Sequence, residues 1–307
     1  MLWRYIDAHR LTSFAKKHKI ELIHSSDLWL NPYMVRVAER LKIPSILHVR
    51  KPIRTREIQK HQCKKATSII AISSRVQQNL LHAGIPNGKI TMINDSVDLE
   101  MFKPRNSHEN VLRRDFSPSG QILIGIVGRI EPIKRQLDLL HAAEQVVRRS
   151  TNTVCFFIVG RIHSRRYFER LKKYVSKRGM GKHVFFTGGR YDMPQVLASL
   201  DILVSLSGGS VMFETMACAK TVISAGFSTL QSAVHIQDGR TGLLVTSRRN
   251  ADLAHAVTKM VNAPELRIRI GNQARKWAED KLSCTLMVDQ THRLYDRLIQ
   301  NSIRTNS

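Results

Sequence analysis

The sequence has no apolar run near the roughly 18 residues that a membrane-spanning helix needs. Its first ten residues, MLWRYIDAHR, also lack the apolar centre of a signal peptide. We therefore expect a cytoplasmic protein. The four cysteines form no Cys-x-x-Cys pair, which argues against a zinc site or a redox motif and favours packing in the core. They are Cys63, Cys155, Cys218 and Cys284.

Acidic and aromatic residues are scarce as well. The chain has 24 Asp and Glu against 49 Lys and Arg, a formal net charge of +25, and only 6% of its residues are aromatic. Such a charge favours polyanions or an anionic bilayer surface as partners. The positive charge is concentrated at 42–65, with eight basic residues and one acid, and at 161–182, with nine and one.

These basic segments leave three interpretations open. The stretch 50–60 has no aromatic residue and few apolar ones. It fits equally a solvated helix face and a peripheral docking surface on the inner face of a membrane. Nucleic-acid binding is the third interpretation, but the chain lacks the aromatic interleaving of a single-strand binder and any recognisable DNA- or RNA-binding motif. We expect no nucleic-acid partner.

Short apolar runs alternate with helical patterns over 307 residues, which predicts an α/β protein with parallel sheets and room for two domains. In the first part, strands are predicted at 21–24, 45–49, 68–72 and 89–93, and helices at 32–41, 54–65 and 74–82. In the second part, six strands are predicted at 122–127, 154–159, 184–187, 202–206, 221–224 and 242–245. Six strands suit a complete doubly wound domain, whereas four leave the first one incomplete.

The predicted domains are 1–105 and 121–307. Between them, 106–120 is rich in Ser, Asn, Pro and Gly and has no apolar periodicity, which predicts a linker. The end of the chain, 250–300, has a helical pattern. It carries an apolar stripe that should pack against another surface, made by Leu286, Met287, Leu294 and Leu298.

Two strand-to-helix loops in the second part carry the chemistry. The first strand there ends at Gly128-Arg129, and Lys134 follows five residues later. A planar guanidinium that grips two oxygens, with a second cation beside it, suits a diphosphate. The second loop, Gly208-Gly209-Ser210-Val211, opens a helix and offers backbone amides to phosphates. A plain turn with a helix cap explains that loop equally well.

Glu214 lies in the first turns of the helix that follows this loop. Its neighbours Val211, Met212, Phe213, Met216 and Ala217 are apolar. An unpaired carboxylate is costly to bury, so we expect Glu214 to have a hydrogen-bonding ligand or partner. The alternative is a first-turn Glu favoured by the helix dipole.

His24 and His48 end two predicted strands of the first part. In open α/β sheets, ligand-contacting residues lie at the carboxyl ends of the strands. Both histidines are therefore candidates for the acceptor side of a site. A hydrogen-bonded structural histidine is the alternative for each.

Several short motifs follow one another along the chain. The first half has His24–Asp27, Ile43-Pro44, Ile72-Ser73 and Asn94–Asp98 with Phe102. The second half has Gly128-Arg129 with Lys134, Glu214–Cys218 and Asp238–Val245. In order and spacing, they resemble the family 4 retaining glycosyltransferases of the GT-B fold, and the resemblance covers nearly the whole chain.

The resemblance implies two Rossmann-like doubly wound domains that transfer a sugar from a nucleotide diphosphate donor. The acceptor it implies is a glycan or a lipid-linked glycan, as in polysaccharide or cell-envelope biosynthesis. Glu214 would hold the ribose hydroxyls, and Arg129 with Lys134 would take the place of a metal. No Asp-x-Asp pair is positioned to hold Mg²⁺, so we expect neither metal nor cofactor.

The sequence also departs from that family. Leu206 stands where the family usually has a Glu that contacts the transferred sugar, and Ala219 and Thr221 replace the usual Gly and Pro. Asp95 stands where Gly is usual, and the glycine-rich first loop of the family is absent. We therefore expect a chain truncated at its N-terminus that binds a donor but transfers little sugar. The alternatives are a non-catalytic remnant with a nucleotide-sugar pocket and a basic protein that binds membranes or polyanions.

Overall fold

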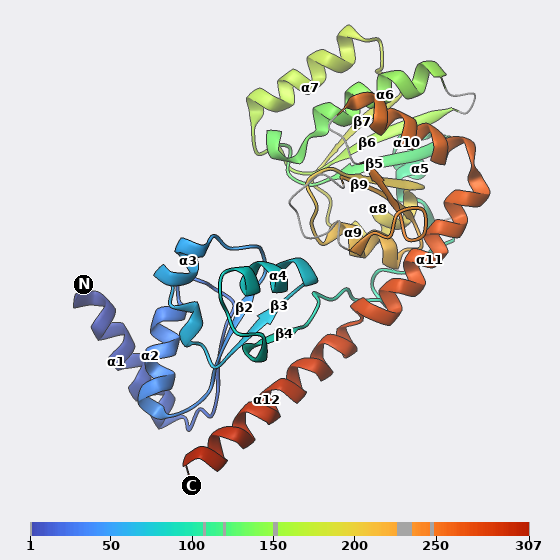
Figure 1. The fold of residues 1–307 in the computed structure, drawn as a ribbon. Coiled ribbons are helices and arrows are strands. Elements are labelled where there is room, and N and C mark those ends of the chain that lie inside the picture. The colour runs from blue at the N-terminus through green and yellow to red at the C-terminus, as the bar shows by residue number, and fades with distance from the viewer. Residues whose placement is uncertain are drawn as a thin grey trace. The chain divides into compact units, whose positions relative to one another are not determined.

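The computed structural model describes residues 2–106, 109–118, 121–149, 153–225, 235–245 and 249–306 (Figure 1). The chain forms two compact units. The first combines Met1–Asp95 with Thr285–Ser307, and the second is Ser96–Cys284. Each unit contains one parallel sheet, so the predicted α/β architecture is confirmed.

The first unit has a four-stranded sheet. Its strands are β1 (Ile23–Ser25), β2 (Ser45–Val49), β3 (Ser68–Ala71) and β4 (Ile90–Met92), all parallel and in sequential order. Its helices are α1 (Leu2–Lys17), α2 (Asn31–Leu41), α3 (Thr55–Lys60), α4 (Ser74–His82) and most of α12 (Cys284–Asn306). The four strands predicted from the apolar runs are confirmed.

The two faces of this sheet have different partners. Side chains alternate along a strand, so Leu47 and Ile69 face α2, α3 and α4, whereas Ile46 and Ile70 face α12. Strands in sequential order place all right-handed crossover helices on one face, which leaves the other face for α12. Leu294 is buried there, with Met287 and Leu298 beside it, so the apolar stripe predicted near the end of the chain packs as expected.

The second unit has a six-stranded sheet. Its strands are β5 (Ile122–Val127), β6 (Val154–Val159), β7 (Val184–Gly188), β8 (Ile202–Ser205), β9 (Thr221–Ala225) and β10 (Leu243–Val245). They are parallel and lie in the order β10-β9-β8-β5-β6-β7. This is the order of a doubly wound domain, in which the direction of winding reverses between β5 and β8.

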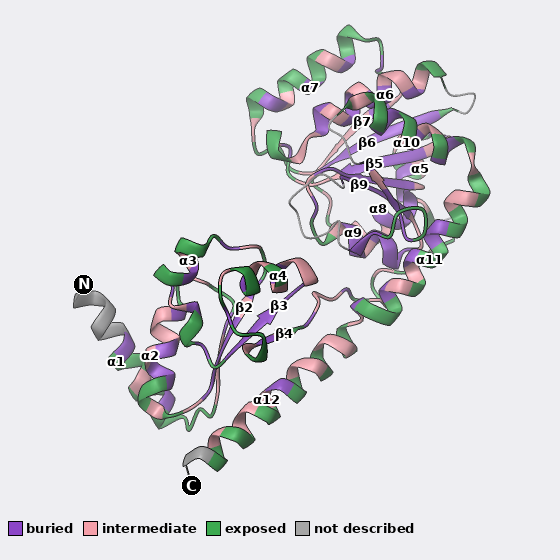
Figure 2. Cartoon of the chain, in the orientation of Figure 1, coloured by how far each residue is buried: buried purple, intermediate pink, exposed green. Residues whose placement is uncertain are grey.

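Helices cover both faces of the second sheet. They are α5 (Val111–Phe116), α6 (Gln136–Arg149), α7 (Arg165–Lys177), α8 (Met193–Ser199), α9 (Val211–Ala217), α10 (Asn250–Asn262) and α11 (Pro264–Leu282). Ile124 and Phe156 pack with α6, α7 and α10, and Leu123 and Phe157 pack with α5, α8, α9 and α11. Figure 2 shows the strands as the buried layer between these helices.

The structure differs from the sequence interpretation at three places. The segment predicted as a linker, 106–120, contains α5, whose Val111 and Leu112 are buried and whose start is capped by the Asn110 side chain. The predicted helix 54–65 is interrupted, since α3 ends at Lys60 and Gln62 has a left-handed backbone with φ 52°. The compact units also differ from the predicted domains, because the second begins at Ser96 and the chain rejoins the first at Thr285.

The cysteines follow the predicted core packing in part. Cys63, Cys155 and Cys218 are buried, and burial raises the pKa of their thiols, to about 12 for Cys218. The prediction was wrong for Cys284, which is exposed at the start of α12. None of the helices in the described ranges is both long and apolar enough to cross a bilayer.

Candidate functional site

The first candidate loop leaves the carboxyl end of β5 at Gly128. Gly128 and Gly160, which follow the neighbouring strands β5 and β6, have φ values of 147° and 154°. A Cβ atom on Gly160 would lie 1.9 Å from the carbonyl oxygen of Gly128. Because no side chain fits in that gap, glycine at these strand ends lets the two loops pass in contact.

Arg129 and Lys134 both lie at this strand end. Lys134 ends the short turn Pro132–Lys134, and its Cδ and Cε atoms lie 3.4 Å from the position that a Cβ on Gly128 would occupy. The Arg129 carbonyl accepts a hydrogen bond from Gln136 Nε2 (2.9 Å). The structure therefore brings Gly128, Arg129 and Lys134 together.

The Arg129 side chain has a partner that the sequence interpretation missed. Its guanidinium lies 2.9 Å from Glu131 Oε1, while 61% of the Arg129 side chain is exposed. Glu131 also approaches His163, at 3.7 Å. Only the Arg129 end of this pair is exposed, because the Glu131 side chain is 14% exposed. The acid two residues after Arg129 was the signal in the sequence.

The second candidate loop follows β8, the strand beside β5. Gly208 and Gly209 have φ values of 71° and 125°, which explains why glycine occupies both positions. A Cβ on Gly209 would meet nothing within 4 Å, so this part of the loop is open. Ser210 precedes α9, which begins at Val211, and the Ser210 side chain does not cap the helix.

Glu214 is half-buried on α9. Met212, Phe213 and Met216 around it are buried. Burial raises the pKa of the Glu214 carboxyl, and a hydrogen bond with Ser210 acts in the opposite direction. The hydrogen bond with Ser210 thus offsets only part of the cost of burying the charged form. The carboxylate can still accept further hydrogen bonds.

The topology relates the two loops. β5 and β8 pair in parallel, with Gly125 opposite Leu203, so the loops leave from neighbouring strands at the same edge of the sheet. They lie at the point where the winding reverses, which is where open α/β sheets bind their ligands. A donor role for Gly128, Arg129, Lys134, Glu214 and the second loop stays a prediction.

Three positions at which the sequence departs from the family pattern have different surroundings in the structure. Leu206 is buried in the apolar cluster of the second unit. Ala219 has a left-handed backbone with φ 57°, the conformation that a Gly would adopt without strain. Asp95 lies 2.7 Å from Arg50 and forms an ion pair with it.

In the first unit, His24 and His48 lie on the same face of the sheet as α12. Their rings are stacked with centroids 5.4 Å apart, and His24 Nδ1 lies 2.6 Å from the hydroxyl of Tyr295. Within the described chain, Nε2 of each histidine is buried without a hydrogen-bond partner. Burial lowers the pKa of both rings, and for His48 the charges of His24 and Arg50 contribute to a value of about 4. Both imidazoles are therefore neutral at pH 7.

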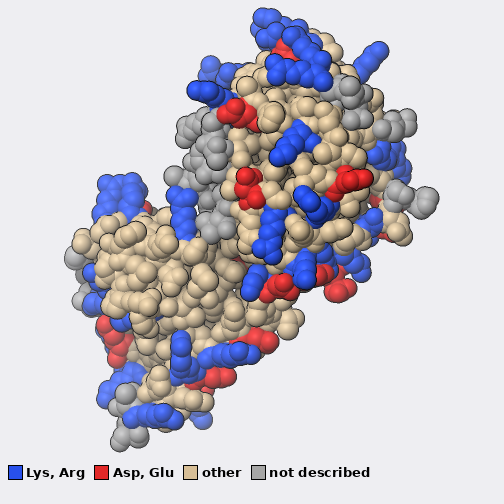
Figure 3. Space-filling model, turned by 45° about the vertical axis from the view of Figure 1, so that its right-hand side comes forward, with Lys and Arg blue, Asp and Glu red and all other residues tan. Residues whose placement is uncertain are grey.

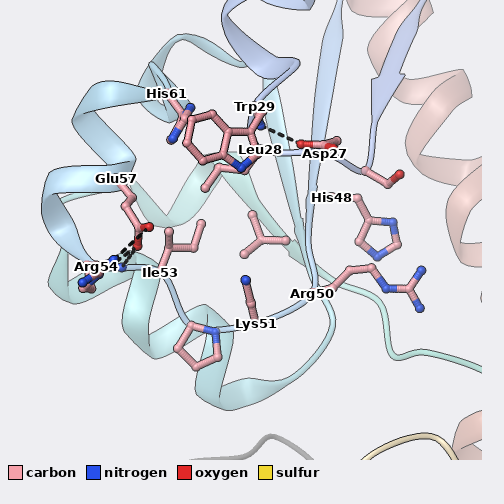
Figure 4. A pocket seen from close by; sticks show the side chains of 13 residues that line it. Asp27, Leu28, Trp29, His48, Arg50, Lys51, Ile53, Arg54, Glu57 and His61 are labelled. Carbon is pink, nitrogen blue, oxygen red and sulfur yellow. Dashed lines mark hydrogen bonds and ion pairs between the residues drawn. The ribbon is translucent and has the colours of Figure 1, made fainter. Parts of the chain in front are cut away.

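A cavity of about 520 Å³ lies at the carboxyl ends of β1 and β2 (Figure 4). Residues after β1 line one side, where Trp29 is 62% exposed. The Trp29 backbone N–H donates a hydrogen bond to Asp27 Oδ1 (2.7 Å). Residues after β2 line the other, where the Lys51 side chain points into the cavity. His48 lines this cavity, whereas His24 does not.

No group of three or more His, Cys, Asp and Glu residues suited to a metal ion occurs in the described ranges.

The chain matches known proteins along most of its length. Residues 108–277 match the model of glycosyl transferases group 1, and residues 1–101 match that of glycosyltransferase family 4. Each of the two α/β units is built on a sheet of parallel strands, and the second sheet has a reversal point. This architecture is typical of nucleotide-binding proteins. The chain belongs to the group 1, family 4 glycosyltransferases, an enzyme family, and has their GT-B fold.

Solved structures of the same fold cover nearly the whole chain. Alr3699/HepE of Anabaena in complex with UDP has a TM-score of 0.86 at 20% identity, over 95% of this chain and 82% of HepE. The lipopolysaccharide outer core galactosyltransferase WaaB has a TM-score of 0.75 at 16% identity, over 97% and 81%.

Curated relatives are matched over a shorter span. A D-inositol 3-phosphate glycosyltransferase of Rhodococcus erythropolis is 28% identical over 236 residues, 73% of this chain and 53% of the relative. An alpha-D-kanosaminyltransferase of Streptomyces kanamyceticus is 24% identical over 77% of this chain and 62% of the relative. The chain thus spans little more than half the length of these relatives.

Proposed function

We propose that this chain is a retaining glycosyltransferase that takes a sugar from a nucleotide diphosphate donor and transfers it to a glycan or lipid-linked acceptor. The observation that carries the proposal is the pair of loops at the reversal point of the second sheet, in a chain of this family. HepE, which has the same fold, was solved with UDP and with UDP-glucose. The alternative is a protein that binds nucleotide sugars without transferring them.

The donor diphosphate would lie over Gly128 and the loop 208–211. As the glycosidic bond breaks, negative charge grows on the leaving phosphate oxygen. Arg129 and Lys134 would stabilise that charge more in the transition state than in the ground state. Arg129 would exchange Glu131 for the phosphate, and two cations remove the need for a divalent metal.

The nucleoside would be held by Glu214. Ribose hydroxyls that donate to its carboxylate would favour the charged form and offset the burial that raises its pKa. Leu206 offers no hydrogen bond to the transferred sugar. Losing one charged hydrogen bond of this kind costs about 1.5 to 3 kcal/mol, which slows transfer by about tenfold to a hundredfold.

The acceptor would enter the cavity beside β1 and β2. The exposed Trp29 ring can pack on the apolar face of a sugar, and the neutral His48 can exchange a hydrogen bond with a hydroxyl group. Sites of this kind combine an aromatic wall with a few polar groups that fix orientation.

A peripheral location on the inner face of a membrane fits the basic surfaces. On α7, buried Tyr167, Leu171 and Val175 face the core, so the basic residues face outward. Figure 3 shows Lys and Arg side chains gathered at the upper end of the second unit, level with α7. Each such charge near an anionic bilayer contributes about 1 kcal/mol.

A transfer assay tests this proposal. The chain is incubated in EDTA with labelled UDP-, GDP- and ADP-sugars and with oligosaccharide or lipid-linked acceptors, while donor binding is measured in parallel. We expect binding of one donor and slow transfer at most. Fast multiple turnover would contradict the weakness we assign to Leu206. Failure to bind any of the donors would contradict the donor site itself.

A further inference from the structure

A small polar cavity of about 190 Å³ lies at the amino edge of the six-stranded sheet, opposite the loops that follow β5 and β8. Ser199 and Asp201 precede β8, and Lys220 precedes β9. The other side is formed by α5 and the segment before it, through Arg105, Glu109 and Arg113. Strands of a parallel sheet place these residues at the edge away from the donor loops.

Most charged groups of this cavity already have partners. Arg113 donates to the carbonyl oxygens of Pro118 (2.8 Å) and Gln121 (2.7 Å). Asp201 accepts from the backbone of Leu123 (2.8 Å). These bonds tie the segment before β5 to the start of β8, so they have a structural role whether or not a ligand is present.

The charges do not cancel. Three cations, Arg105, Arg113 and Lys220, line the cavity together with two carboxylates, Glu109 and Asp201, which leaves one positive charge in excess. Arg105 pairs with Glu109 at 3.1 Å. Apart from this pair, the charged residues of the lining are Arg113, Lys220 and Asp201.

Lys220 is the least compensated of these groups. No residue in the described ranges forms an ion pair or a hydrogen bond with its ammonium group. Burial lowers the pKa of Lys220, and the charge of Asp201 acts in the opposite direction. Lys220 is half-buried, and an anion beside its ammonium group would offset the cost of that partial burial.

Two further polar atoms of the residues that line the cavity have no hydrogen-bond partner among the described residues. Ser199 is 3% exposed, and its Oγ atom has no hydrogen-bond partner within the part of the chain that the structure describes. The same holds for Nε of Arg105. The Lys220 ammonium group and the Arg105 guanidinium belong to residues that line this one cavity, and two such cations suit a tetrahedral oxyanion.

We propose that this cavity binds a small oxyanion of the phosphate class, held by Lys220 and Arg105. The site is separate from the donor site and does not depend on the proposed sugar transfer. The bound anion would join the segment before α5 to the starts of β8 and β9 and thereby stabilise the second unit.

Calorimetric titration with inorganic phosphate at constant ionic strength tests this site. We expect phosphate to bind the unaltered chain and to bind Lys220→Met about tenfold or more weakly, the scale of one charged hydrogen bond. The matched control is Lys182→Met, an exposed lysine of the same unit, which should bind phosphate like the unaltered chain. Equal affinity for all three proteins would overturn the proposal.

A second variant covers the case in which Lys220→Met does not fold. Arg105→Gln changes a side chain that is 24% exposed, and it should also weaken phosphate binding. Saturating phosphate should leave the affinity for UDP unchanged, because the two sites lie at opposite sheet edges. If phosphate displaces UDP while Arg105→Gln binds phosphate normally, phosphate occupies the donor site and the proposal fails.

Discussion

The two sheets of this protein differ in how their strands are ordered. In the first unit, β1 to β4 lie in sequential order, so the crossover helices cover one face and α12 covers the other. In the second unit, the strand order reverses between β5 and β8. Helices α6, α7 and α10 cover one face of this sheet, and α5, α8, α9 and α11 cover the other. Within the described residues, the second sheet therefore has a reversal point and the first has none, and such a point is the usual ligand crevice of these sheets.

The difference also explains where the unusual polar groups lie. In the first unit, His24 and His48 share a face with Ile46 and Ile70, and α12 closes over that face with Tyr295 on His24. In the second unit, Arg129 and Lys134 follow the end of β5 and lie outside the apolar clusters, whereas Glu214 lies on α9 beside buried apolar residues. We therefore expect burial to determine the protonation of the two histidines. We expect the exposed charge of Arg129 to determine how it binds an anion.

The largest change in the free energy of unfolding is expected for a substitution at Leu206. This substitution tests whether position 206 belongs to the site or to the core. Leu206→Glu should lower the free energy of unfolding by about 3 kcal/mol, because it buries a carboxyl among apolar groups. Burial would raise the pKa of this new carboxyl, so the loss should grow as the pH rises.

Urea unfolding at pH 5 and pH 8 measures this effect. Leu206→Met, which keeps the volume and the apolar character, should cost less than about 1.5 kcal/mol. A stable Leu206→Glu protein that also gains transfer activity would show that position 206 faces the sugar.

A smaller effect is expected at His48 in the first unit. Its pKa of about 4 in the folded chain lies below the ordinary 6.5, so the unfolded chain binds more protons between these values. Stability should therefore fall as the pH drops from about 6.5 to 4. After allowance for partial exposure, we expect a loss of about 1 to 2 kcal/mol.

Comparison of the unaltered chain with His48→Gln checks this expectation. The variant should lose much of the dependence on acid pH in urea unfolding, whereas His82→Gln, at an exposed position of the same unit, should keep it. Identical profiles for all three proteins would show that His48 is protonated as easily as a free histidine.

The smallest effect is expected at Ala219. Its left-handed backbone costs an alanine about 1 kcal/mol or more, and a glycine avoids most of that cost. Ala219→Gly should raise the free energy of unfolding by about 0.5 to 1 kcal/mol. Ala256→Gly within α10 should lower it by a similar amount. If both substitutions destabilise the chain, Ala219 is not strained in solution.

Much of the fold could be predicted because each strand is an apolar run bounded by polar or glycine-containing segments. The ten predicted strands are confirmed. Helix α5 was missed because six residues give little periodicity, and Ser, Asn, Pro and Gly around it indicate a loop. The break at Gln62 had no signal, since neither Gly nor Pro marks it.

The candidate site was only partly predictable. Glycines at strand ends identified both loops, and their positive φ values agree with that interpretation. The ion pair of Arg129 with Glu131 could not be predicted with its geometry, because a carboxylate two residues away reaches the guanidinium only in a particular turn. The stacking of His24 on His48 depends on strand register, which the sequence does not give.

The most direct test of the donor site is titration calorimetry with UDP, GDP and ADP, each with and without EDTA, on the unaltered chain and on Arg129→Ala. Arg148→Ala, an exposed arginine on α6 paired with Glu144, is the control. We predict that one nucleotide binds equally well in EDTA, and that Arg129→Ala weakens binding by about 1.5 to 3 kcal/mol while Arg148→Ala has no effect. Absence of binding, its loss in EDTA, or normal binding by Arg129→Ala would contradict this account.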